Sequence, residues 1–487
     1  MNNPSILPPL RRRVFCNRTL NLRAIKAIGF DMDYTLVHYD VTQWEESAYQ
    51  QLKQRLSQLG WPVSGLKLDP EFAVLGLVLD LEHGNTVKAN RFGYVKAAYH
   101  GTERIDFEQQ KKIYSRVLVN LAEPRWVFLN TLFSLSEACM YAQLVHKLDR
   151  GKLPGRMNYG DLYRTVRQNL DQAHAEGQLK HEITSNPDRY VLLDEETPLA
   201  LLDLKHSGKK LMLITNSDWF YTRSMMAHAF DRFLPAGTTW RDLFHLVVLQ
   251  ARKPSFFDTD NPFFEVMDDE GFLKPVTGPL KEGGIYFGGN AGPVEDLFSL
   301  SGEEFLYVGD HIFADVHMSK SLLRWRTALV LKALEEELSA LEGFQDKQRA
   351  LNVLMAEKEA LEHQSCLLRL QIQRREIGYG PDPGTSGEQQ RALLQDVRQR
   401  LTALDDRIGP LARKHAELRH PRWGLLLRTG NDKSHLARQI ERYADLYTSS
   451  VSNLLHSTPF AFFRSPYTTM PHDQDITSCD PRPIAPE

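Results

Sequence analysis

The sequence predicts an α/β protein with three parts: a core of parallel strands flanked by helices, an inserted α+β cap domain, and a C-terminal helical hairpin of the coiled-coil kind. Three observations predict this arrangement. Short apolar runs end abruptly in polar residues, a long segment separates the first run from the second, and a later stretch repeats apolar residues at spacings of three and four. A chain of 487 residues is also too long for one compact core, so several units are expected.

Four apolar runs have the composition of buried strands. Continuous apolar runs of this length, with helical stretches between them, are typical of parallel strands that are covered on both faces. In such sheets, ligands bind just beyond the carboxyl ends of the strands. Each run stops at residues that can bind or react with a ligand, so the four ends together predict a functional site. The runs are Ala27–Phe30, Leu211–Ile214, Leu246–Leu249 and Phe305–Val308.

The segment between the first two runs predicts a separate cap. It is far longer than a crossover helix requires. It contains strand-like sequence near Gly84–Gly101 and helical patterns at Thr131–Leu148 and Asp161–Gly177. Because this insertion follows a strand end, a domain formed by residues 41–199 would cover the site and exclude water. The core is then expected to comprise residues 1–40, 200–332 and 421–472.

Residues 333–420 are expected to form the helical hairpin. Apolar residues from Leu351 to Ile372, and again from Leu394 to Leu418, follow the alternating spacing of a coiled-coil seam. A cluster rich in glycine and proline, beginning at Gly378, separates the two series and indicates an antiparallel turn. Pro410 lies in the second series and is expected to bend or break that arm.

Beyond the hairpin, the chain returns to a globular composition. Arg438–Leu455 has the pattern of an amphipathic helix, and Pro459–Phe463 has that of an aromatic packing segment. Residues 473–487 are rich in proline and aspartate and are expected to be a disordered tail.

The overall composition excludes several classes of protein. The 59 basic and 62 acidic residues nearly balance, which gives no basis for an extended nucleic-acid surface. The four cysteines form no Cys-x-x-Cys pair, so neither a disulfide framework nor a cysteine-based zinc site is expected. No apolar run reaches the length of a membrane span, and none of secretory type follows the N-terminal arginines. These features predict a cytoplasmic protein that binds neither nucleic acid nor membrane.

Asp31 and Asp33 stand two residues apart, directly after the first predicted strand. A phosphate monoester is a dianion at neutral pH and repels an anionic nucleophile, so attack on it requires a nearby cation and fixed donors. A carboxylate can attack phosphorus to form an aspartyl-phosphate. A second carboxylate can protonate the leaving alkoxide and then deprotonate the hydrolytic water. Taken alone, the pair could equally be a strand-terminal turn or a helix cap.

The second and third strand ends carry groups that suit a phosphate. Thr215, Asn216 and Ser217 offer hydroxyl and backbone N–H groups to phosphate oxygens, although an ordinary helix N-cap has the same composition. Lys253 could place a positive charge beside the phosphate and the nucleophile, or it could be a solvated loop residue.

The fourth strand end adds two carboxylates, Asp310 and Asp315. A few hard oxygen ligands suit Mg²⁺, which keeps several waters and shares the phosphate. Asp310 could instead cap a helix. All four groups occur at strand ends in this order, which favours a Mg²⁺-dependent phosphatase.

The order of these motifs resembles that of the haloacid dehalogenase superfamily, whose core is a Rossmann-like sheet. More narrowly, the chain resembles the cytosolic purine 5′-nucleotidases that act on IMP and GMP, and the resemblance covers most of its length. The motifs that carry it are Gly29-Phe-Asp-Met-Asp-Tyr-Thr-Leu, Leu129-Asn-Thr-Leu-Phe, Thr215-Asn-Ser-Asp, Ala251-Arg-Lys-Pro, Gly309-Asp-His-Ile-Phe-Ala-Asp, Trp325-Arg-Thr-Ala and Arg442-Tyr-Ala-Asp-Leu-Tyr.

This resemblance implies roles for the residues at the strand ends. Asp31 would be the nucleophile and Asp33 the general acid/base. Asp31, the main-chain carbonyl of Asp33, and Asp310 would bind Mg²⁺, and Asp315 would help to orient the site. The phosphate would be held by Thr215, Asn216, Ser217 and Lys253.

The resemblance also places the residues that recognise the purine in the cap. Phe133 would stack on the base, and an aromatic face with polar neighbours suits a 6-oxo purine. Each of these residues has a simpler structural alternative, such as a core position or a solvated helix face. The polar contacts would come from Arg167, Asp171, His174 and Lys180.

Several functions remain compatible with the sequence. The leading prediction is Mg²⁺-dependent hydrolysis of purine nucleoside 5′-monophosphates. The same aspartyl-phosphate could instead pass its phosphoryl group to a nucleoside, or the substrate could be another small phosphate monoester. A scaffold with a vestigial site is a further alternative. Because exposed heptad seams commonly find partners, a homo-oligomer is expected.

Overall fold

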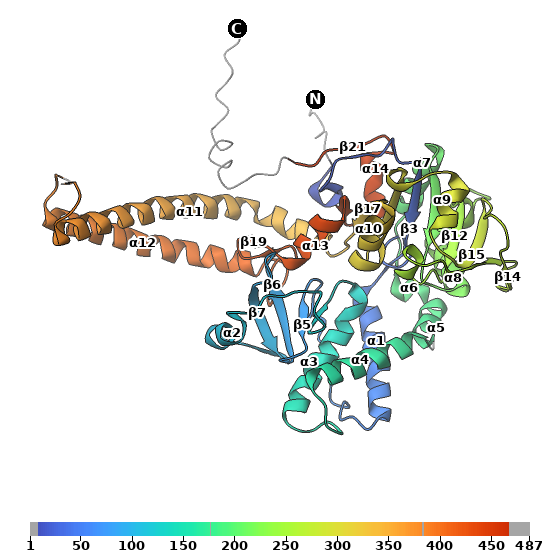
Figure 1. Cartoon of the computed structure of the whole chain (residues 1–487), viewed down its shortest axis with the longest axis horizontal. Coiled ribbons are helices and arrows are strands. Elements are labelled where there is room, and N and C mark those ends of the chain that lie inside the picture. Colours follow the sequence, from blue (N-terminus) through green and yellow to red (C-terminus); the bar gives the residue numbers. More distant parts are fainter. Residues whose placement is uncertain (1–7, 176, 382–383, 467–487) are drawn as a thin grey trace, which may run out of the picture.

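The computed structural model describes residues 8–175, 177–381 and 384–466. It comprises a sheet-based core, a cap below it, and a long pair of helices that projects from the core (Figure 1). The predicted disordered tail, residues 473–487, lies outside the described residues.

Within the described part of the chain, ten strands form the central sheet, in the order β1-β20-β17-β16-β3-β11-β12-β15-β13-β14. The four predicted strands lie next to one another in this sheet and pair in parallel. The predicted α/β fold with a parallel sheet is therefore confirmed. These strands are β16 (Phe305–Gly309), β3 (Ala27–Phe30), β11 (Lys210–Ile214) and β12 (Leu246–Leu249).

Both faces of the central strands are buried, which explains their continuous apolar sequence. Ile28 and Phe30 of β3 pack in one hydrophobic cluster, whereas Ala27 packs in another together with Met212 and Ile214 of β11. Alternate residues point to opposite faces of a strand, so a sheet that is covered on both sides requires apolar residues at every position.

The remaining strands extend the sheet on either side. On one side lie β17 (Arg326–Val330), β20 (Leu446–Thr448) and β1 (Phe15–Cys16), and on the other β15 (Gly284–Gly288), β13 (Phe263–Val266) and β14 (Leu273–Pro275). The longer helices of the core are α7 (Glu196–His206), α8 (Trp219–Phe230), α9 (Gly292–Phe298), α10 (Met318–Leu323) and α13 (His435–Tyr443).

The cap combines a small sheet with helices. Its strands, in the order β8-β7-β6-β5-β9, are β8 (Glu103–Arg104), β7 (Val95–His100), β6 (Asn85–Ala89), β5 (Val78–Asp80) and β9 (Trp126–Phe128). Its helices are α1 (Val41–Gln58), α2 (Phe107–Tyr114), α3 (Leu135–Asp149), α4 (Tyr159–Ala175), α5 (Gln178–Ser185) and α6 (Pro187–Tyr190).

A two-stranded ribbon joins the core to the cap. The chain leaves the core through β4 (His38–Tyr39) and returns through β10 (Val191–Leu192), and these strands pair antiparallel, with Tyr39 opposite Val191. Both residues of β4 are buried. We call β4 and β10 the hinge ribbon.

The projecting pair consists of α11 (Leu334–Ile377) and α12 (Gly387–Ala416). The two helices pack through residues of the predicted heptad seam, including Leu354 and Leu361 of α11 and Val397 and Leu404 of α12. Within the described residues, no helix is both long enough and apolar enough to cross a membrane, α11 included.

Of the two outcomes expected at Pro410, a bend or a break, the break does not occur: α12 continues through this residue to Ala416. A proline removes one backbone hydrogen bond from a helix. Ile408 and Leu411 pack against α11 on either side of Pro410 and hold the last turns in place.

The helix predicted over Arg438–Leu455 is wrong beyond its first turns. Helix α13 ends at Tyr443, and the chain then enters the central sheet as β20, which pairs in parallel with β17. Asp445 causes this change of structure. Its buried carboxylate accepts a hydrogen bond from the backbone N–H of Thr327 at 3.0 Å and pairs with Arg326 at 3.1 Å, both in β17.

Candidate active site

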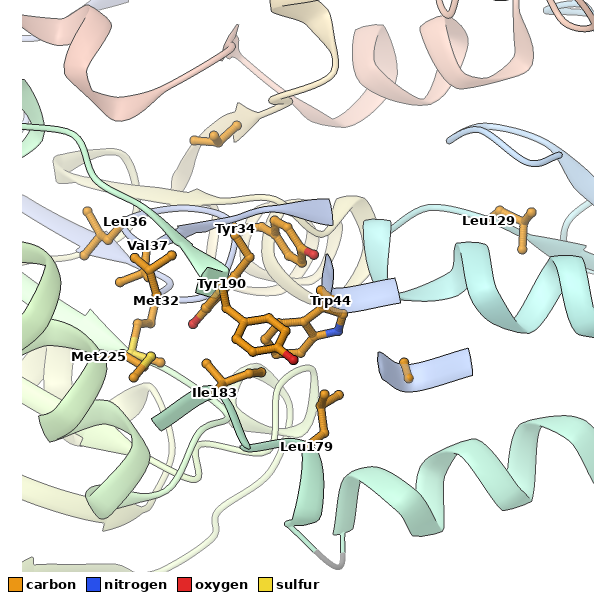
Figure 2. Packing of buried hydrophobic residues seen from close by; sticks show 14 of the residues in the cluster. Met32, Tyr34, Leu36, Val37, Trp44, Leu129, Leu179, Ile183, Tyr190 and Met225 are labelled. Atoms are coloured by element: carbon orange, nitrogen blue, oxygen red, sulfur yellow. The ribbon is translucent and has the colours of Figure 1, made fainter. Parts of the chain in front are cut away.

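The segment after β3 directs two carboxylates to the same side of the chain. Met32 and Tyr34 are buried in the core, at 0% and 1% exposure, and alternate with Asp31 and Asp33. Figure 2 shows Met32 and Tyr34 among the buried hydrophobic side chains of this cluster. Phe30 pairs with Val308 of β16 and with Leu213 of β11, so these three strands end at the same level.

Lys253 lies at the centre of the site, in the loop after β12. Its Nζ is 2.7 Å from Asp31 Oδ1 and 2.8 Å from Asp315 Oδ1. It also donates to the hydroxyl of Tyr307 at 3.0 Å, and that hydroxyl donates to the carbonyl of Ile214. Only 3% of the Lys253 side chain is exposed. Two adjacent carboxylates therefore hold a buried ammonium group in a fixed position.

The loop after β11 fixes the backbone of Lys253. Asn216 Oδ1 accepts a hydrogen bond from the Lys253 N–H at 2.6 Å, and Asn216 Nδ2 donates to the Lys253 carbonyl at 3.1 Å. Thr215 is fully buried, and its hydroxyl oxygen accepts from the Ser217 N–H at 3.0 Å. Thr215 thus shapes the loop from which Asn216 and Ser217 reach the site.

Asp33 is held by hydroxyl groups. Tyr39 of the hinge ribbon donates to Asp33 Oδ1 at 2.5 Å, and Ser217 donates to Asp33 Oδ2 at 2.8 Å. Tyr221 donates to the Tyr39 hydroxyl at 3.0 Å. Lys180 of the cap reaches the same place and donates to the Ser217 hydroxyl at 3.4 Å. Asp33 therefore lacks the direct lysine contact that Asp31 has.

A cluster of carboxylates surrounds the end of β16. Oxygen atoms of Asp31, Asp310 and Asp315 lie within 4.8 Å of one another. Burial raises the pKa of Asp31 to about 7, and Lys253 opposes this rise. Burial, together with the charges of Asp315 and Asp31, raises the pKa of Asp310 well above its usual range. Three carboxylates, of which Asp315 is fully buried and Asp31 and Asp310 partly so, leave negative charge uncompensated beside one lysine, so the donor set fits a hard cation that takes oxygen ligands.

The close approach of Asp315 depends on a glycine. Asp315 lies in a π-helical turn, η7 (Ile312–His317), and its Oδ2 accepts from the His311 N–H at 3.1 Å. A Cβ at position 309 would lie 2.4 Å from this oxygen, which is inside the contact distance. The turn itself is capped by His311, whose Nδ1 accepts from the N–H of Ala314 at 2.9 Å.

A cavity of about 330 Å³ opens onto these groups between core and cap. One wall is aromatic: Phe133 packs edge-on against Tyr34 and Trp44, with ring centroids 4.7 and 5.1 Å away. The lining residues from the predicted sites are Asp31, Asp33, Phe133, Arg167, Asp171, Lys180, Asn216, Ser217, Lys253, Asp310 and Asp315.

Polar residues of the cap lie at the same cavity. Arg167 pairs with the buried Glu137 at 2.9 Å and with Asp171 at 3.1 Å, so its guanidinium group is held in place. Lys180 pairs with Asp218 of the core at 3.1 Å. His174 lies in α4, but its side chain is outside the described part of the structure.

The structure brings together most of the predicted site residues, with Thr215 set behind the wall of the cavity. Sequence reasoning missed Tyr39, Tyr221 and Tyr307, which hold Asp33 and Lys253, and also Trp44 and Glu137. None of these five stands at the end of a predicted strand. No local sequence signal marks any of the five, because their partners lie on other segments of the chain.

The fold and the positions of these groups define the class of protein. A central parallel strand that ends in Asp-x-Asp, with a lysine and two further aspartates at neighbouring strand ends, is the arrangement of the haloacid dehalogenase-type hydrolases. The family model described as the 5′ nucleotidase family matches residues 14–475, and the chain belongs to this family. It is accordingly a phosphoric monoester hydrolase.

Two relatives match nearly the whole chain. A 5′-nucleotidase domain-containing protein of Dictyostelium discoideum is 26% identical over 476 residues, which cover 94% of this chain and 74% of that protein. The 5′-nucleotidase domain-containing protein 2 of Homo sapiens is 27% identical over 499 residues, covering 97% and 88%.

Similar solved structures cover 63% of this chain. An archaeal β-phosphoglucomutase from a Pyrococcus species has 11% identity and a TM-score of 0.31, with 86% of its own chain covered. A haloacid dehalogenase-like family hydrolase from Xanthomonas campestris has 13% identity and a TM-score of 0.25, with 82% covered.

Proposed function

We propose that the protein hydrolyses purine nucleoside 5′-monophosphates such as IMP and GMP, with Mg²⁺ as cofactor and Asp31 as nucleophile. The observation that carries this proposal is the contact of Lys253 with Asp31 beside Asp310 and Asp315, at the end of a cavity with an aromatic wall. A cavity of about 330 Å³ is within the range of small-molecule sites.

Asp31 contacts a lysine and Asp33 a serine hydroxyl, and this difference supports different roles for the two carboxylates. The ammonium group of Lys253 favours the anionic form of Asp31, as a nucleophile requires. The hydroxyl group of Ser217 can either donate to Asp33 or accept from it, so it tolerates both protonation states of that residue. This freedom suits a group that must give up a proton and take one back.

The reaction then proceeds in two displacements. A carboxylate oxygen of Asp31 attacks phosphorus, the bond between phosphorus and O5′ breaks, and Asp33 gives its proton to O5′. Water next attacks the aspartyl-phosphate, Asp33 takes a proton from that water, and phosphate leaves with Asp31 restored. Lys253 offsets negative charge on the phosphoryl oxygens, and Asn216 and Ser217 lie beside it as phosphate donors.

The carboxylate cluster would hold the cation. Asp31 and Asp310 would be its ligands, together with the carbonyl of Asp33, and Asp315 would orient Lys253. Bound Mg²⁺ would neutralise charge on the phosphoryl oxygens.

The cap supports a nucleotide rather than a small sugar phosphate. The aromatic rings of Phe133 and Trp44 both line the cavity, edge-on to each other, and aromatic rings stack on bases. Arg167, Asp171 and Lys180 provide donors and an acceptor at the same cavity. His174 and Thr215 remain predicted contacts to base and phosphate, and the cytoplasmic location remains a prediction from composition.

The test measures phosphate release from IMP, GMP, AMP and a sugar phosphate, with Mg²⁺ and with EDTA. We expect release from IMP and GMP that requires Mg²⁺ and that disappears in Asp31→Asn, which has nearly the same shape as the native residue. Asp346→Asn alters an exposed carboxylate in the hairpin and serves as a matched control. Rapid hydrolysis of the sugar phosphate, with IMP and GMP left intact, would refute the nucleotide assignment.

A further inference from the structure

Tyr39 stands behind Asp33 on the side away from the cavity. Its side chain is 1% exposed and it does not line the cavity, whereas Asp33 and Ser217 do. Its hydroxyl lies 2.5 Å from Asp33 Oδ1, and Ser217 binds Oδ2 from the cavity side. The two oxygens of Asp33 are therefore held by different residues: Ser217, which lines the cavity, and Tyr39, which does not.

A directed chain of hydroxyl groups fixes the Tyr39 proton. Because the Tyr221 hydroxyl donates to the Tyr39 oxygen at 3.0 Å, the proton of Tyr39 remains available for Asp33. The backbone of Tyr39 is held as well, since it pairs with Val191 in the hinge ribbon. Tyr39 thus receives support from α8 and from the strand that returns from the cap.

We propose that Tyr39 is the positioning residue for general acid/base catalysis by Asp33. It occupies Oδ1, so the exchangeable proton of Asp33 is carried on Oδ2, which faces Ser217 and the leaving group. The inference rests on the proposed function, because it assigns Tyr39 a role in protonating O5′. Without the Tyr39 hydroxyl, the carboxyl group can rotate, and its proton no longer points toward the cavity.

The leaving group provides the test. A nucleoside leaves as a poor alkoxide and needs its proton from Asp33, whereas p-nitrophenolate leaves without protonation. We therefore expect Tyr39→Phe to slow single-turnover release of inosine from IMP by about tenfold or more, the lower range of acid/base effects. The KM for IMP should stay within about twofold. Single-turnover release of p-nitrophenol from p-nitrophenyl phosphate should stay near the wild-type rate.

Two further variants serve as a negative control and as a reference for this measurement. Tyr49→Phe removes another buried tyrosine hydroxyl, one that lies 2.5 Å from Gln143 Oε1 within the cap, and it should leave both rates unchanged. Asp33→Asn removes the general acid completely and gives the largest decrease in rate that Tyr39→Phe could approach. Wild-type rates in Tyr39→Phe, or equal slowing with both leaving groups, would overturn the inference while leaving the proposed function intact. A wild-type protein that is inactive on both substrates would instead refute the proposed function.

A different observation concerns the outer face of α11. Beside the seam that packs on α12, a second series follows the same alternating spacing on the exposed side. Its large apolar members are Val353, Leu367, Leu370 and Ile377, which are 68%, 46%, 37% and 69% exposed. The complete series is Val353, Ala356, Ala360, His363, Leu367, Leu370, Arg374 and Ile377.

This outer stripe is self-complementary in an antiparallel pairing. Val353 then meets Ile377 of a second copy, Ala360 meets Leu370, and His363 meets Leu367, so these three layers join a smaller or polar residue to a larger apolar one, while Ala356 meets Arg374 in the fourth. The stripe is about 36 Å long at 1.5 Å per residue. Among the described residues of α12, by contrast, Leu393 is the one exposed large apolar side chain.

We infer that the outer stripe of α11 binds the same stripe of a second copy of this chain, antiparallel. In this register, the two-fold axis passes at Ser365, so the exposed Cys366 residues of the two copies lie one residue from the axis and close to each other, at a position flanking the seam. We expect a dimer in analytical ultracentrifugation and a cross-linked dimer after mild oxidation, which Cys366→Ser abolishes.

Charged residues substituted into the outer stripe should dissociate the dimer. We expect Leu367→Glu with Leu370→Glu to give a monomer that keeps its phosphatase activity, and Leu393→Glu to remain dimeric. A monomeric wild-type protein at micromolar concentration would overturn this inference. So would a dimer that persists in the double variant, or a dimer that does not cross-link through Cys366.

Discussion

Lys253 Nζ lies 2.7 Å from Asp31 Oδ1, and the two side chains are only 3% and 14% exposed. Removing one member of a buried pair leaves the other charge without compensation, which typically costs about 3–5 kcal/mol. We therefore expect Lys253→Met to lower the free energy of unfolding in EDTA by about this amount and to abolish activity.

Urea unfolding measures that loss, and a surface pair provides the comparison. Lys210 pairs with Glu282 at 2.9 Å, but their side chains are 37% and 49% exposed. Lys210→Met should cost less than about 1 kcal/mol, because exposed pairs contribute little. Equal losses in the two variants would contradict the central position given to Lys253.

Gly309→Ala should disturb the cation site. The added Cβ would lie 2.4 Å from Asp315 Oδ2, so the carboxylate that orients Lys253 must move. We expect a large loss of activity and a smaller rise in melting temperature on adding Mg²⁺. Differential scanning fluorimetry with and without Mg²⁺ measures that rise.

Gly343→Ala is the matched control for this substitution. Gly343 lies in α11 with no atom within 4 Å of an added Cβ. Alanine is preferred to glycine in a helix by about 1 kcal/mol, so this variant should be slightly more stable and fully active. A Gly309→Ala protein with a wild-type response to Mg²⁺ would show that the close approach is not required.

Glu45 predicts a dependence of stability on pH. Its side chain is buried, and burial raises the pKa of Glu45 to about 7. The folded protein therefore holds a proton that the unfolded chain releases above its own pKa. The contribution of this group to stability is complete below the unfolded pKa of about 4.3 and is lost as pH rises through 7.

Glu45→Gln removes this titration. The glutamine keeps an oxygen that can accept the hydrogen bond from the Ser136 N–H. We expect the free energy of unfolding to fall less between pH 5 and pH 7 in the variant than in the wild type. Parallel pH profiles for the two proteins would show that Glu45 is ionised in the folded state.

A substitution of Phe133 tests the proposal that the cap binds the base. The ring of Phe133 lines the cavity together with Trp44 and packs edge-on against Tyr34. Phe133→Ala should raise the KM for IMP by about tenfold, corresponding to about 1.4 kcal/mol of lost binding. The KM for β-glycerophosphate, which has no base, should change little.

An exposed phenylalanine of the cap provides the control for that experiment. Phe92 is 55% exposed and lies outside the cavity, so Phe92→Ala should leave both KM values unchanged. If Phe133→Ala raised both KM values equally, Phe133 would have a structural role rather than one in base recognition.

Much of the core was predictable because its signals are local. Each central strand is a continuous apolar run, since both faces of the sheet are covered, and each run ends at a polar group. The sequence alone therefore predicts that Asp31, Lys253 and Asp310 lie at one edge of the sheet. The heptad seam between α11 and α12 was also predictable from local sequence, because its apolar residues repeat at the period of a helix.

The errors and omissions arose where distant partners decide the structure. The pattern at Arg438–Leu455 looks helical, but the helix ends at Tyr443, and the buried contacts of Asp445 hold the next residues, Leu446–Thr448, as a strand beside β17. Tyr39 and Tyr307 carry no local mark of function, because their partners become neighbours only when the strands assemble.

The sequence by itself determined which chemical groups stand at the ends of the strands, since strand formation depends on local apolar patterning. Only the tertiary structure decided what surrounds those groups: the lysine shared by Asp31 and Asp315, the hydroxyls around Asp33, and the aromatic wall of the cap. The physical reason is that a pKa, an ion pair or a stacking surface depends on distances in space. Those distances are set by packing between segments that lie far apart along the chain.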